Sequence, residues 1–323
     1  MKQVTDQKPI NSPFHAKSTA AEVIKGVDLS GKFAIVTGGH SGIGFETVKA
    51  LASAGAEILV PARDASKAKE ALAGVAGKIS VASMDLADLQ SVRKFSGEVK
   101  AERKSIDLLL NNAGIMACPE MRAGKGWELQ FATNHLGHFT LTTALAPLLK
   151  AANGARVVSL SSVAHKLSAI RWDDIHFVKE PYHKWVAYGQ SKTANALFAR
   201  ELDRRMKADG VRAFSVHPGG IMTPLQRHLQ LEEMVAAGWV NEKGEPSELV
   251  KALFKTPEQG ASTTVFAATS RLLDGIGGVY CEDCNIAALG GADAPRYAMV
   301  QPHACDDADA ARLWTETEKM LAA

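Results

Sequence analysis

The sequence predicts an α/β protein with a doubly wound parallel sheet in a single domain and a helical elaboration late in the chain. Short apolar segments alternate with longer amphipathic ones over the first two thirds of the sequence. This pattern is typical of strands buried on both faces and joined by right-handed crossover helices. The 323 residues are 46% hydrophobic, which is enough to bury a large core.

The expected strands are short and rich in branched apolar side chains. They lie at residues 33–36, 57–60, 79–81, 107–110, 157–160 and 213–216, and a last strand is expected at 277–281. The expected helices span residues 44–54, 66–73, 89–102, 127–150, 185–208 and 257–270, with a tail helix at 306–321. Gly55 and Gly210 end two of these helices, and Asp88 is an expected N-cap.

Composition and charge argue against several kinds of partner. A formal net charge of +2 without long basic runs disfavours nucleic acid or an acidic membrane surface. No apolar run approaches the roughly 20 residues of a membrane span. The polar start of the chain, interrupted by Pro9 and Pro13, differs from a signal peptide. We therefore expect a cytoplasmic protein without a membrane span.

Neither the cysteines nor the histidines predict a metal site. Cys281 and Cys284 form a Cys-x-x-Cys pair, but no second pair or histidine cluster completes a ligand set. Four cysteines are also too few and too scattered for a disulfide framework in a chain of this size. Several histidines are interpreted as structural or solvent-facing, including His40, His135, His165 and His217.

A glycine-rich turn follows the first expected strand and opens a helix. Its glycines are spaced Gly-x-x-x-Gly-x-Gly between Gly38 and Gly44. Glycine allows a tight turn whose backbone N–H groups approach a pyrophosphate, and the helix dipole favours that anion. The turn predicts a dinucleotide site on a Rossmann-type sheet; a plain glycine-rich turn is the alternative. The expected contacts are Gly38, His40, Ser41, Gly42, Ile43 and Gly44.

The end of the second expected strand carries Arg63, where NAD-preferring folds place an acidic residue on the ribose 2′-hydroxyl. The planar guanidinium group is suited to clamp a 2′-phosphate and to stack on adenine. The sequence therefore favours NADP(H) over NAD(H) as the cofactor. Asp64 keeps two interpretations open, a cap for the following helix or an acceptor for an NAD ribose hydroxyl.

Two further strand ends complete the expected cofactor site. Asp85 and Leu86 follow the third strand. The carboxylate of Asp85 either accepts from the adenine amino group or simply begins the next helix. Small residues close the fourth strand and let a cofactor lie against the backbone, namely Asn112, Ala113 and Gly114.

Tyr188 and Lys192 form a Tyr-x-x-x-Lys pair in an expected helix. Side chains at positions i and i+4 lie on one face of a helix, so the ammonium group can reach the phenol. A nearby positive charge lowers the pKa of a phenol toward the range that acid/base chemistry at neutral pH needs. Alone, the pair also fits two unrelated side chains on a solvated helix face.

Together these motifs closely resemble the short-chain dehydrogenase/reductase family. The resemblance rests on their order and spacing and covers residues 29–285. The stretch from Val158 to His165 and the long insertion between serine and tyrosine resemble the retinol-dehydrogenase-like and WW-domain-oxidoreductase-like branch. The motifs are Thr37-Gly-x-x-x-Gly-Ile-Gly44, Asn111-Asn-Ala-Gly114, Ser161-Ser162, Tyr188-x-x-x-Lys192 and Pro218-Gly219.

The resemblance implies roles for individual residues. Ser162 would donate a hydrogen bond to the substrate oxygen, and Tyr188 would pass the proton. Lys192 would lower the pKa of Tyr188 and hold the nicotinamide ribose, while Asn134 would anchor a water that links Lys192 to solvent. The plainer alternatives are a turn cap for Ser162 and a backbone partner for Asn134. The nicotinamide would be enclosed by Pro218, Gly219, Ile221 and Thr223, the last of which could also be a helix N-cap.

The resemblance further implies an alcohol dehydrogenase or carbonyl reductase that interconverts a ketone or aldehyde with its alcohol. Its substrate is expected to be small and apolar, and the protein a homodimer or homotetramer. Alternatives are an NADP-binding regulatory or scaffold protein with little turnover and, third, an epimerase or dehydratase. Candidate pocket residues, half of which fit an ordinary core equally well, are Met116, Trp172, Trp185, Met222, Leu225 and Trp239.

These expectations divide the chain into three parts. Residues 1–28 form an N-terminal extension. Residues 29–290 form the dinucleotide-binding catalytic domain, including a substrate loop at 223–255. Residues 291–323 form a C-terminal tail that ends in a helix.

Overall fold

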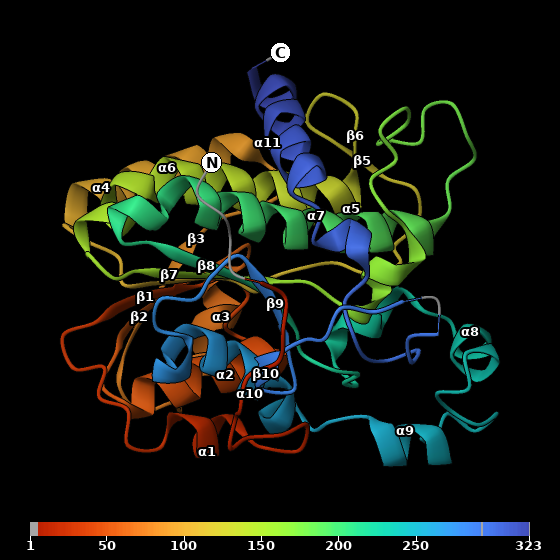
Figure 1. The fold of residues 1–323 in the computed structure, drawn as a ribbon, viewed down its shortest axis with the longest axis horizontal. Helices are drawn as coiled ribbons and strands as arrows, with labels where there is room; N and C mark the ends of the chain where they lie inside the picture. Colours follow the sequence, from red (N-terminus) through yellow and green to blue (C-terminus); the bar gives the residue numbers. More distant parts are fainter. Residues whose placement is uncertain (1–5, 292, 323) are drawn as a thin grey trace.

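A computed structural model describes residues 6–291 and 293–322 of the chain. An eight-stranded sheet in the order β10-β9-β8-β7-β4-β1-β2-β3 lies between two layers of helices (Figure 1). Its neighbouring strands are parallel, except that β10 pairs antiparallel with β9. The predicted doubly wound parallel sheet in a single domain is confirmed.

All seven predicted strands are present, most of them extended or shifted by one or two residues. Strands β1 and β4 are buried along their whole length, which explains their continuous apolar sequences. Since β1 pairs with both β2 and β4, the winding reverses there, and the carboxyl ends of β1 and β4 define the expected nucleotide edge. The strands are β1 (Phe33–Val36), β2 (Glu57–Ala62), β3 (Lys78–Ser83), β4 (Leu108–Asn111), β7 (Arg156–Leu160), β8 (Arg212–His217), β9 (Val279–Glu282) and β10 (Asn285–Ile286).

Each face of the sheet has its own apolar core. On one face lie α1 (Ala20–Ile24), α2 (Gly42–Ser53), α3 (Ala65–Leu72) and α10 (Pro257–Thr269) (Figure 1). On the other lie α4 (Leu89–Glu102), α6 (Gly137–Ala151), α7 (Lys184–Met206) and α11 (Asp307–Ala322). Asp88 caps α4 as predicted, because its side chain accepts from Gln90 N at 2.9 Å.

The helix predicted over residues 127–150 is wrong at its start. Trp127–Glu128 is instead strand β6, which pairs with β5 (Arg122–Ala123) in a small hairpin. The buried Glu128 carboxylate then accepts from Gln130 N and Phe131 N and begins α5 (Leu129–Phe131). A π-helical turn η1 (Ala132–Leu136) joins α5 to α6. Sequence periodicity missed the hairpin because each of its strands is only two residues long, too short to show an alternating pattern.

The predicted elaboration after β8 is helical. It contains η4 (Pro224–His228), α8 (Leu231–Ala236) and α9 (Glu248–Leu253). The predicted tail helix is α11, and it packs against α7 (Figure 1). The Trp314 ring of α11 lies 4.7 Å from Phe139 and 5.9 Å from Phe198, centroid to centroid. The tail helix therefore belongs to the core of one face.

The three-part division of the chain stays a prediction. Residues 1–5, 292 and 323 of its outer parts lie outside the described residues. Within the described part of the N-terminal extension, Gln7 Nε2 donates to Tyr280 O at 2.8 Å and to Ala287 O at 2.7 Å. Among the described residues, no helix is both long and apolar enough to cross a membrane.

Candidate active site

Thr37 connects the ends of β1 and β4 at the edge where the site is expected. Its hydroxyl oxygen accepts from Asn112 N and Ala113 N, each at 2.9 Å, and lies 2.9 Å from His138 Nε2. Asn112 Nδ2 in turn donates to Thr37 O at 2.8 Å. The glycine-rich turn and the predicted segment Asn112, Ala113 and Gly114 are therefore held together by the hydroxyl and carbonyl groups of Thr37.

Gly44 shows why this turn needs glycine. A Cβ at this position would lie 2.4 Å from Gly38 O and 2.5 Å from Asn112 Nδ2, closer than any side chain tolerates. The turn leads into α2, whose N-cap Ser41 makes no side-chain cap hydrogen bond. The first N–H groups of α2 therefore keep their donors for an anion.

The turn is suited to hold a nucleotide. His40 Nδ1 and Asn112 Oδ1 are buried and have no hydrogen-bond partner within the described part of the chain. Buried polar atoms are rarely left unpaired, so these two atoms point to a missing ligand. A cavity of about 340 Å³ opens here, lined by His40, Ser41, Gly42, Phe45, Glu46, Ala71, Met222, Thr223, Pro224 and Pro257.

Arg63 and Asp64 follow β2, and the structure separates their environments. Asp64 caps α3: its carboxylate accepts from Lys67 N at 3.1 Å and lies 3.3 Å from Lys67 Nζ. These hydrogen bonds hold the pKa of Asp64 below its usual value. Arg63 is exposed and lies near His40. Burial lowers the pKa of the His40 imidazole, and the positive charge of Arg63 lowers it further.

Asp85 and Leu86 lie where β3 passes into α4. Asp85 Oδ1 accepts from Ala87 N at 2.9 Å, and Asp85 N donates to Ser91 Oγ at 3.0 Å. Leu86 is buried against the start of α6, where a Cβ on Gly137 would lie 2.3 Å from Leu86 O. The helix-start interpretation of Asp85 is thus present, and its second carboxylate oxygen leaves room for the adenine interpretation.

Tyr188 and Lys192 lie on the buried face of α7, each only 4% exposed. The Lys192 ammonium group lies 5.5 Å from the centroid of the Tyr188 ring and donates to Leu160 O at 3.0 Å. Gly114 closes the other side, since a Cβ there would lie 3.5 Å from Lys192 Nζ. The alternative of two side chains on a solvated face does not fit this burial.

Burial dominates the acidity of this pair. It raises the pKa of Tyr188 to about 12, although a hydrogen bond with Ser162 lowers it in part. Burial also lowers the pKa of Lys192 to about 8. The sequence led us to expect a lowered tyrosine pKa, and in the protein alone the direction is the opposite. The reason is desolvation: burial penalises the charged phenolate by more than the nearby lysine ammonium group stabilises it.

Ser162 ends β7 and caps the 3-10 turn η2 (Val163–Leu167). Its Oγ accepts from Ala164 N at 3.1 Å. The turn-cap interpretation is therefore present, but it uses only an acceptor lone pair. The hydroxyl hydrogen remains to be donated, to Tyr188 in the protein alone or to a substrate oxygen, so capping and catalysis are compatible in the same side chain.

Asn134 lies in the π-helical turn between α5 and α6. Its Oδ1 accepts from Ile115 N at 2.9 Å, and its Nδ2 donates to Ile115 O at 3.0 Å and to Ser191 Oγ at 2.9 Å. A Cβ on Gly114 would lie 3.2 Å from Asn134 Oδ1. Asn134 thus does bind backbone groups, and in doing so it holds the segment after β4 beside Lys192.

The segment after β8 closes over the glycine-rich turn. A Cβ on Gly42 would lie 3.5 Å from Thr223 Cβ, and one on Gly260 would meet both Ile43 and Ile221 within 2.8 Å. Thr223 also N-caps η4 in a capping box with Gln226, as the alternative interpretation expected. The structure thereby brings residues of two predicted cofactor motifs, distant in the sequence, into contact.

Pro218 and Gly219 begin this segment, and Gly219 has a φ of +102° that favours glycine. The stem of Lys255 packs on it, since a Cβ on Gly219 would lie 2.8 Å from Lys255 Cδ. Lys255 Nζ pairs with Asp283 at 2.6 Å, and Lys255 N donates to Gly220 O at 2.8 Å. Sequence reasoning missed Lys255, because nothing local marks a lysine that folds back over a distant glycine.

An apolar cluster surrounds Tyr188. The rings of Trp185 and Tyr188 are 6.4 Å apart, and those of Trp185 and Trp239 are 6.1 Å apart. Trp172, predicted for this pocket, lies instead in another cluster under Arg312, and Met222 is exposed beside the glycine-rich turn. The cluster contains Met116, Ala117, Ala164, Tyr188 and Leu229, with Trp185, Leu225, Met234 and Trp239 packed against it.

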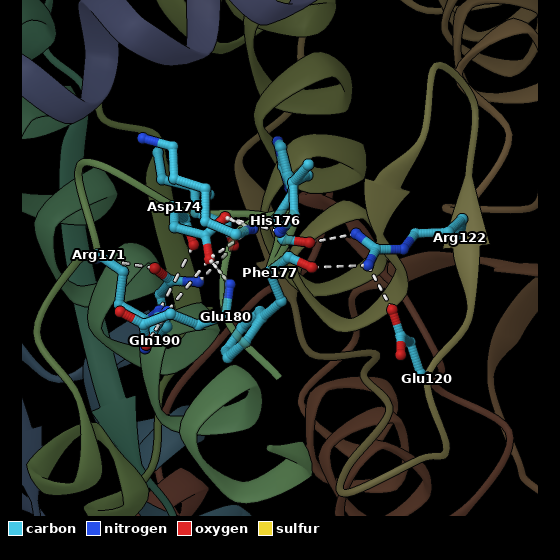
Figure 2. Close-up of polar contacts among 11 residues, drawn as sticks. Glu120, Arg122, Arg171, Asp174, His176, Phe177, Glu180 and Gln190 are labelled. Atoms are coloured by element: carbon cyan, nitrogen blue, oxygen red, sulfur yellow. Dashed lines mark hydrogen bonds and ion pairs between the residues drawn. The ribbon is translucent and has the colours of Figure 1, made fainter. Parts of the chain in front are cut away.

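The insertion between Ser162 and Tyr188 is held to α7 by a polar network (Figure 2). Gln190 Oε1 accepts from Arg171 N at 2.8 Å, and Gln190 Nε2 donates to Ile175 O at 2.9 Å. The Asp174 carboxylate accepts from Val178 N at 2.7 Å, and Arg122 donates to the carbonyl groups of residues 176 and 177. The insertion is therefore anchored two residues beyond the tyrosine.

Comparison with known proteins identifies the class to which this fold and site belong. A family model described as short chain dehydrogenase matches residues 32–234. The chain belongs to the short-chain dehydrogenase/reductase family and is an oxidoreductase of that family. Members of this family bind nicotinamide cofactors, which agrees with the donors left free at the glycine-rich turn.

Individual relatives place the chain in the retinol-dehydrogenase-like branch. It is 45% identical over 294 residues to a probable oxidoreductase of Streptomyces antibioticus, covering 89% of this chain and 97% of the relative. It is 36% identical over 313 residues to human retinol dehydrogenase 14, covering 91% and 87%. A solved structure of an uncharacterized protein from Mycobacterium paratuberculosis is similar with a TM-score of 0.70 and 33% identity, covering 94% and 97%.

Proposed function

We propose that this oxidoreductase interconverts a small apolar ketone or aldehyde with its alcohol and uses NADP(H). One observation carries the proposal. The buried Tyr188 hydroxyl shares a hydrogen bond with Ser162 inside an apolar cluster, with the Lys192 ammonium group 5.5 Å from the phenol ring. Two donors beside a cation in an apolar pocket are what a developing alkoxide needs.

The residues of this corner have distinct tasks in the reduction direction. A bound nicotinamide would supply the hydride. Ser162 and Tyr188 donate hydrogen bonds to the carbonyl oxygen, where negative charge develops. Tyr188 then gives up its proton, and because burial raises its pKa to about 12, it holds that proton at neutral pH. Lys192, with a pKa of about 8, is charged at neutral pH and stabilises the phenolate.

The choice of NADP(H) is supported by charge at the end of β2. Arg63 is exposed and available, whereas the one carboxylate beside it is engaged as a helix cap. A guanidinium group suits a 2′-phosphate, while an NAD-preferring site needs a free carboxylate. We therefore assign Arg63 to the 2′-phosphate and the glycine-rich turn to the pyrophosphate.

The substitution Tyr188→Phe tests the function. It should lower kcat/KM by about 10²- to 10⁴-fold for every substrate, the usual contribution of a positioned proton donor, while the Kd of NADPH changes little. The parent and variant are compared on aliphatic and aromatic aldehydes and ketones. Retinal is included because one relative is a retinol dehydrogenase by name. Tyr182→Phe is a matched control, since it removes a half-buried phenol that binds Gln130 and Cys118 O.

Two outcomes would contradict the proposal. If Tyr188→Phe turns over the panel as fast as the parent, the proton-donor assignment is wrong. If the parent binds NADPH tightly but leaves every substrate unchanged, a regulatory or scaffold protein that keeps the family fold describes it better.

A further inference from the structure

The imidazole of His165 lies directly behind Ser162 and is fully buried. His165 N donates to Ser162 O at 3.0 Å, and His165 Nδ1 lies 2.7 Å from the same oxygen. The Ser162 carbonyl group thus receives two contacts from one residue three positions along the chain. Sequence analysis interpreted this histidine as structural or solvent-facing, with no tie to the serine.

The second ring nitrogen of His165 is bound by the C-terminal strap, which we define as residues 295–304. Gln301 N donates to His165 Nε2 at 3.0 Å, and His303 Nε2 lies 3.0 Å from His165 O. Lys166 donates to two further carbonyl groups of the strap, Pro295 O and Ala298 O. Four contacts therefore join the strap to the turn that follows Ser162.

These contacts determine the tautomer of the ring. A backbone N–H group can only donate, so Nε2 of His165 must be an acceptor and the proton must be on Nδ1. The Nδ1–H group then donates to Ser162 O. Burial lowers the pKa of His165 to about 4, so the ring is neutral at physiological pH and keeps this arrangement.

We propose that His165 is a positioning residue whose Nδ1–H group holds the Ser162 carbonyl group and thereby aims the Ser162 hydroxyl at the substrate oxygen, while the C-terminal strap keeps the ring proton on Nδ1. Ser162 Oγ accepts from Ala164 N, the residue before His165, so a fixed turn backbone also fixes where Oγ points. The inference rests on the proposed function, in which Ser162 donates to the substrate. It extends the active site to a strap more than 130 residues away in sequence.

Two substitutions of His165 separate its two contacts. His165→Asn keeps an amide donor near the Nδ1 position but cannot reach Gln301 N. His165→Gln reaches the Nε2 position and can accept from Gln301 N, but it loses the donor to Ser162 O. We expect His165→Asn to keep kcat within about threefold of the parent, and His165→Gln to lower it by about 10- to 100-fold, the size of effect that slight misplacement of a reacting group produces. The Kd of NADPH should change little in both.

A double-mutant cycle with Ser162→Ala distinguishes positioning from a general structural role. If His165 acts through the Ser162 hydroxyl, His165→Gln should lower kcat about 10- to 100-fold in the parent but less than about twofold in the Ser162→Ala background. An equal fold-loss in both backgrounds overturns the proposal. A parent-like kcat for His165→Gln overturns it as well.

A pair of substitutions at Gln301 tests the strap without changing the imidazole. Gln301 has φ −76°, which proline adopts, so Gln301→Pro keeps the local backbone conformation while it removes the N–H group and places Cδ against His165 Nε2. Gln301→Ala keeps that group and controls for the lost side chain. We expect Gln301→Ala to match the parent and Gln301→Pro to lower kcat severalfold, because the proton of His165 is then free to move to Nε2. Equal kcat values for the two overturn the role of the strap.

One measurement does not depend on catalysis. Hydrogen exchange at the Gln301 amide should be fast in His165→Asn and protected in His165→Gln and the parent. Equal protection in all three overturns the tie between ring and strap. If exchange behaves as expected but neither Tyr188→Phe nor Ser162→Ala slows turnover, the proposed function has failed while the tie between ring and strap stands.

Discussion

The catalytic corner and the nucleotide side of the site differ in burial. Tyr188 and Lys192 on α7 are each 4% exposed, whereas Arg63, directly after β2, is exposed. In the catalytic corner, the chain itself supplies the partners: Lys192 binds Leu160 O, and Asn134 binds Ile115 and Ser191. At the glycine-rich turn, His40 Nδ1 lacks a partner within the described residues.

The difference shows which part of the site is complete before ligands bind. The catalytic corner is preorganised, which costs the chain the burial of an amine and a phenol. The nucleotide side keeps free donors and an exposed cation, and these gain partners only from an anionic ligand. Substitutions in the corner should therefore change stability and chemistry, and substitutions on the nucleotide side should change binding.

Lys192→Met gives the largest expected effect on stability. Because the folded pKa of Lys192 is lowered to about 8, the unfolded chain binds more protons between pH 8 and the normal lysine range. The parent is thus destabilised below pH 8, and this penalty disappears as pH rises toward about 10. The stability of the variant relative to the parent should fall by about 3 kcal/mol from pH 7 to pH 10, as measured by denaturant unfolding.

The control for this substitution is Lys251→Met, because Lys251 is exposed on α9 and pairs with the exposed Glu248. Its stability relative to the parent should not depend on pH over the same interval. A difference between Lys192→Met and the parent that stays constant from pH 7 to pH 10 would show that the corner does not hold a costly buried charge.

The local motifs of the site could be predicted, because each consists of residues that are close together in the sequence. Each motif spans only a few residues, as in Gly38 to Gly44 or the pair Tyr188 and Lys192. Sequence spacing alone therefore predicts which of these residues lie close together. The strands followed for the same reason, since their burial is encoded in continuous apolar runs. Contacts between distant segments have no such signal: Lys255 over Gly219 and Gln301 on His165 join residues 36 and 136 positions apart.

The pKa of Tyr188 illustrates a second limit. The i, i+4 spacing correctly places the ammonium group near the ring, but the effect of burial depends on how much of the fold covers α7. That burial comes from the segment after β4, the turn η2 and the segment after β8, none of which the local motif contains. Periodicity likewise predicted a helix over 127–150, although one buried carboxylate, Glu128, decides where the helix begins.

Arg63→Ala sharpens the nucleotide side of the comparison. Loss of charge-assisted hydrogen bonds to a 2′-phosphate should weaken the Kd of NADPH by about 10- to 100-fold, while the Kd of NADH changes less than about twofold. Fluorescence titration of the reduced cofactors measures both. Stability should stay at the parent level, because Arg63 is exposed.

Lys67→Ala is the matched control, since Lys67 is an exposed cation one turn further along α3. It should leave the ratio of the two Kd values unchanged. Equal losses of NADPH and NADH affinity in Arg63→Ala would mean that another group holds the 2′-phosphate.

Asp64→Ala gives the smallest expected effect and separates the two interpretations of this carboxylate. As the cap of α3, Asp64 accepts from Lys67 N at 3.1 Å. Its loss should lower the Tm by about 2–4 °C and leave the ratio of NADPH to NADH affinity unchanged. Asp64→Asn keeps a capping oxygen and should recover most of the Tm. If instead Asp64→Ala selectively weakens the binding of NADH, the carboxylate contacts the ribose. The carboxylate would then belong to the nucleotide site as well as to the helix cap.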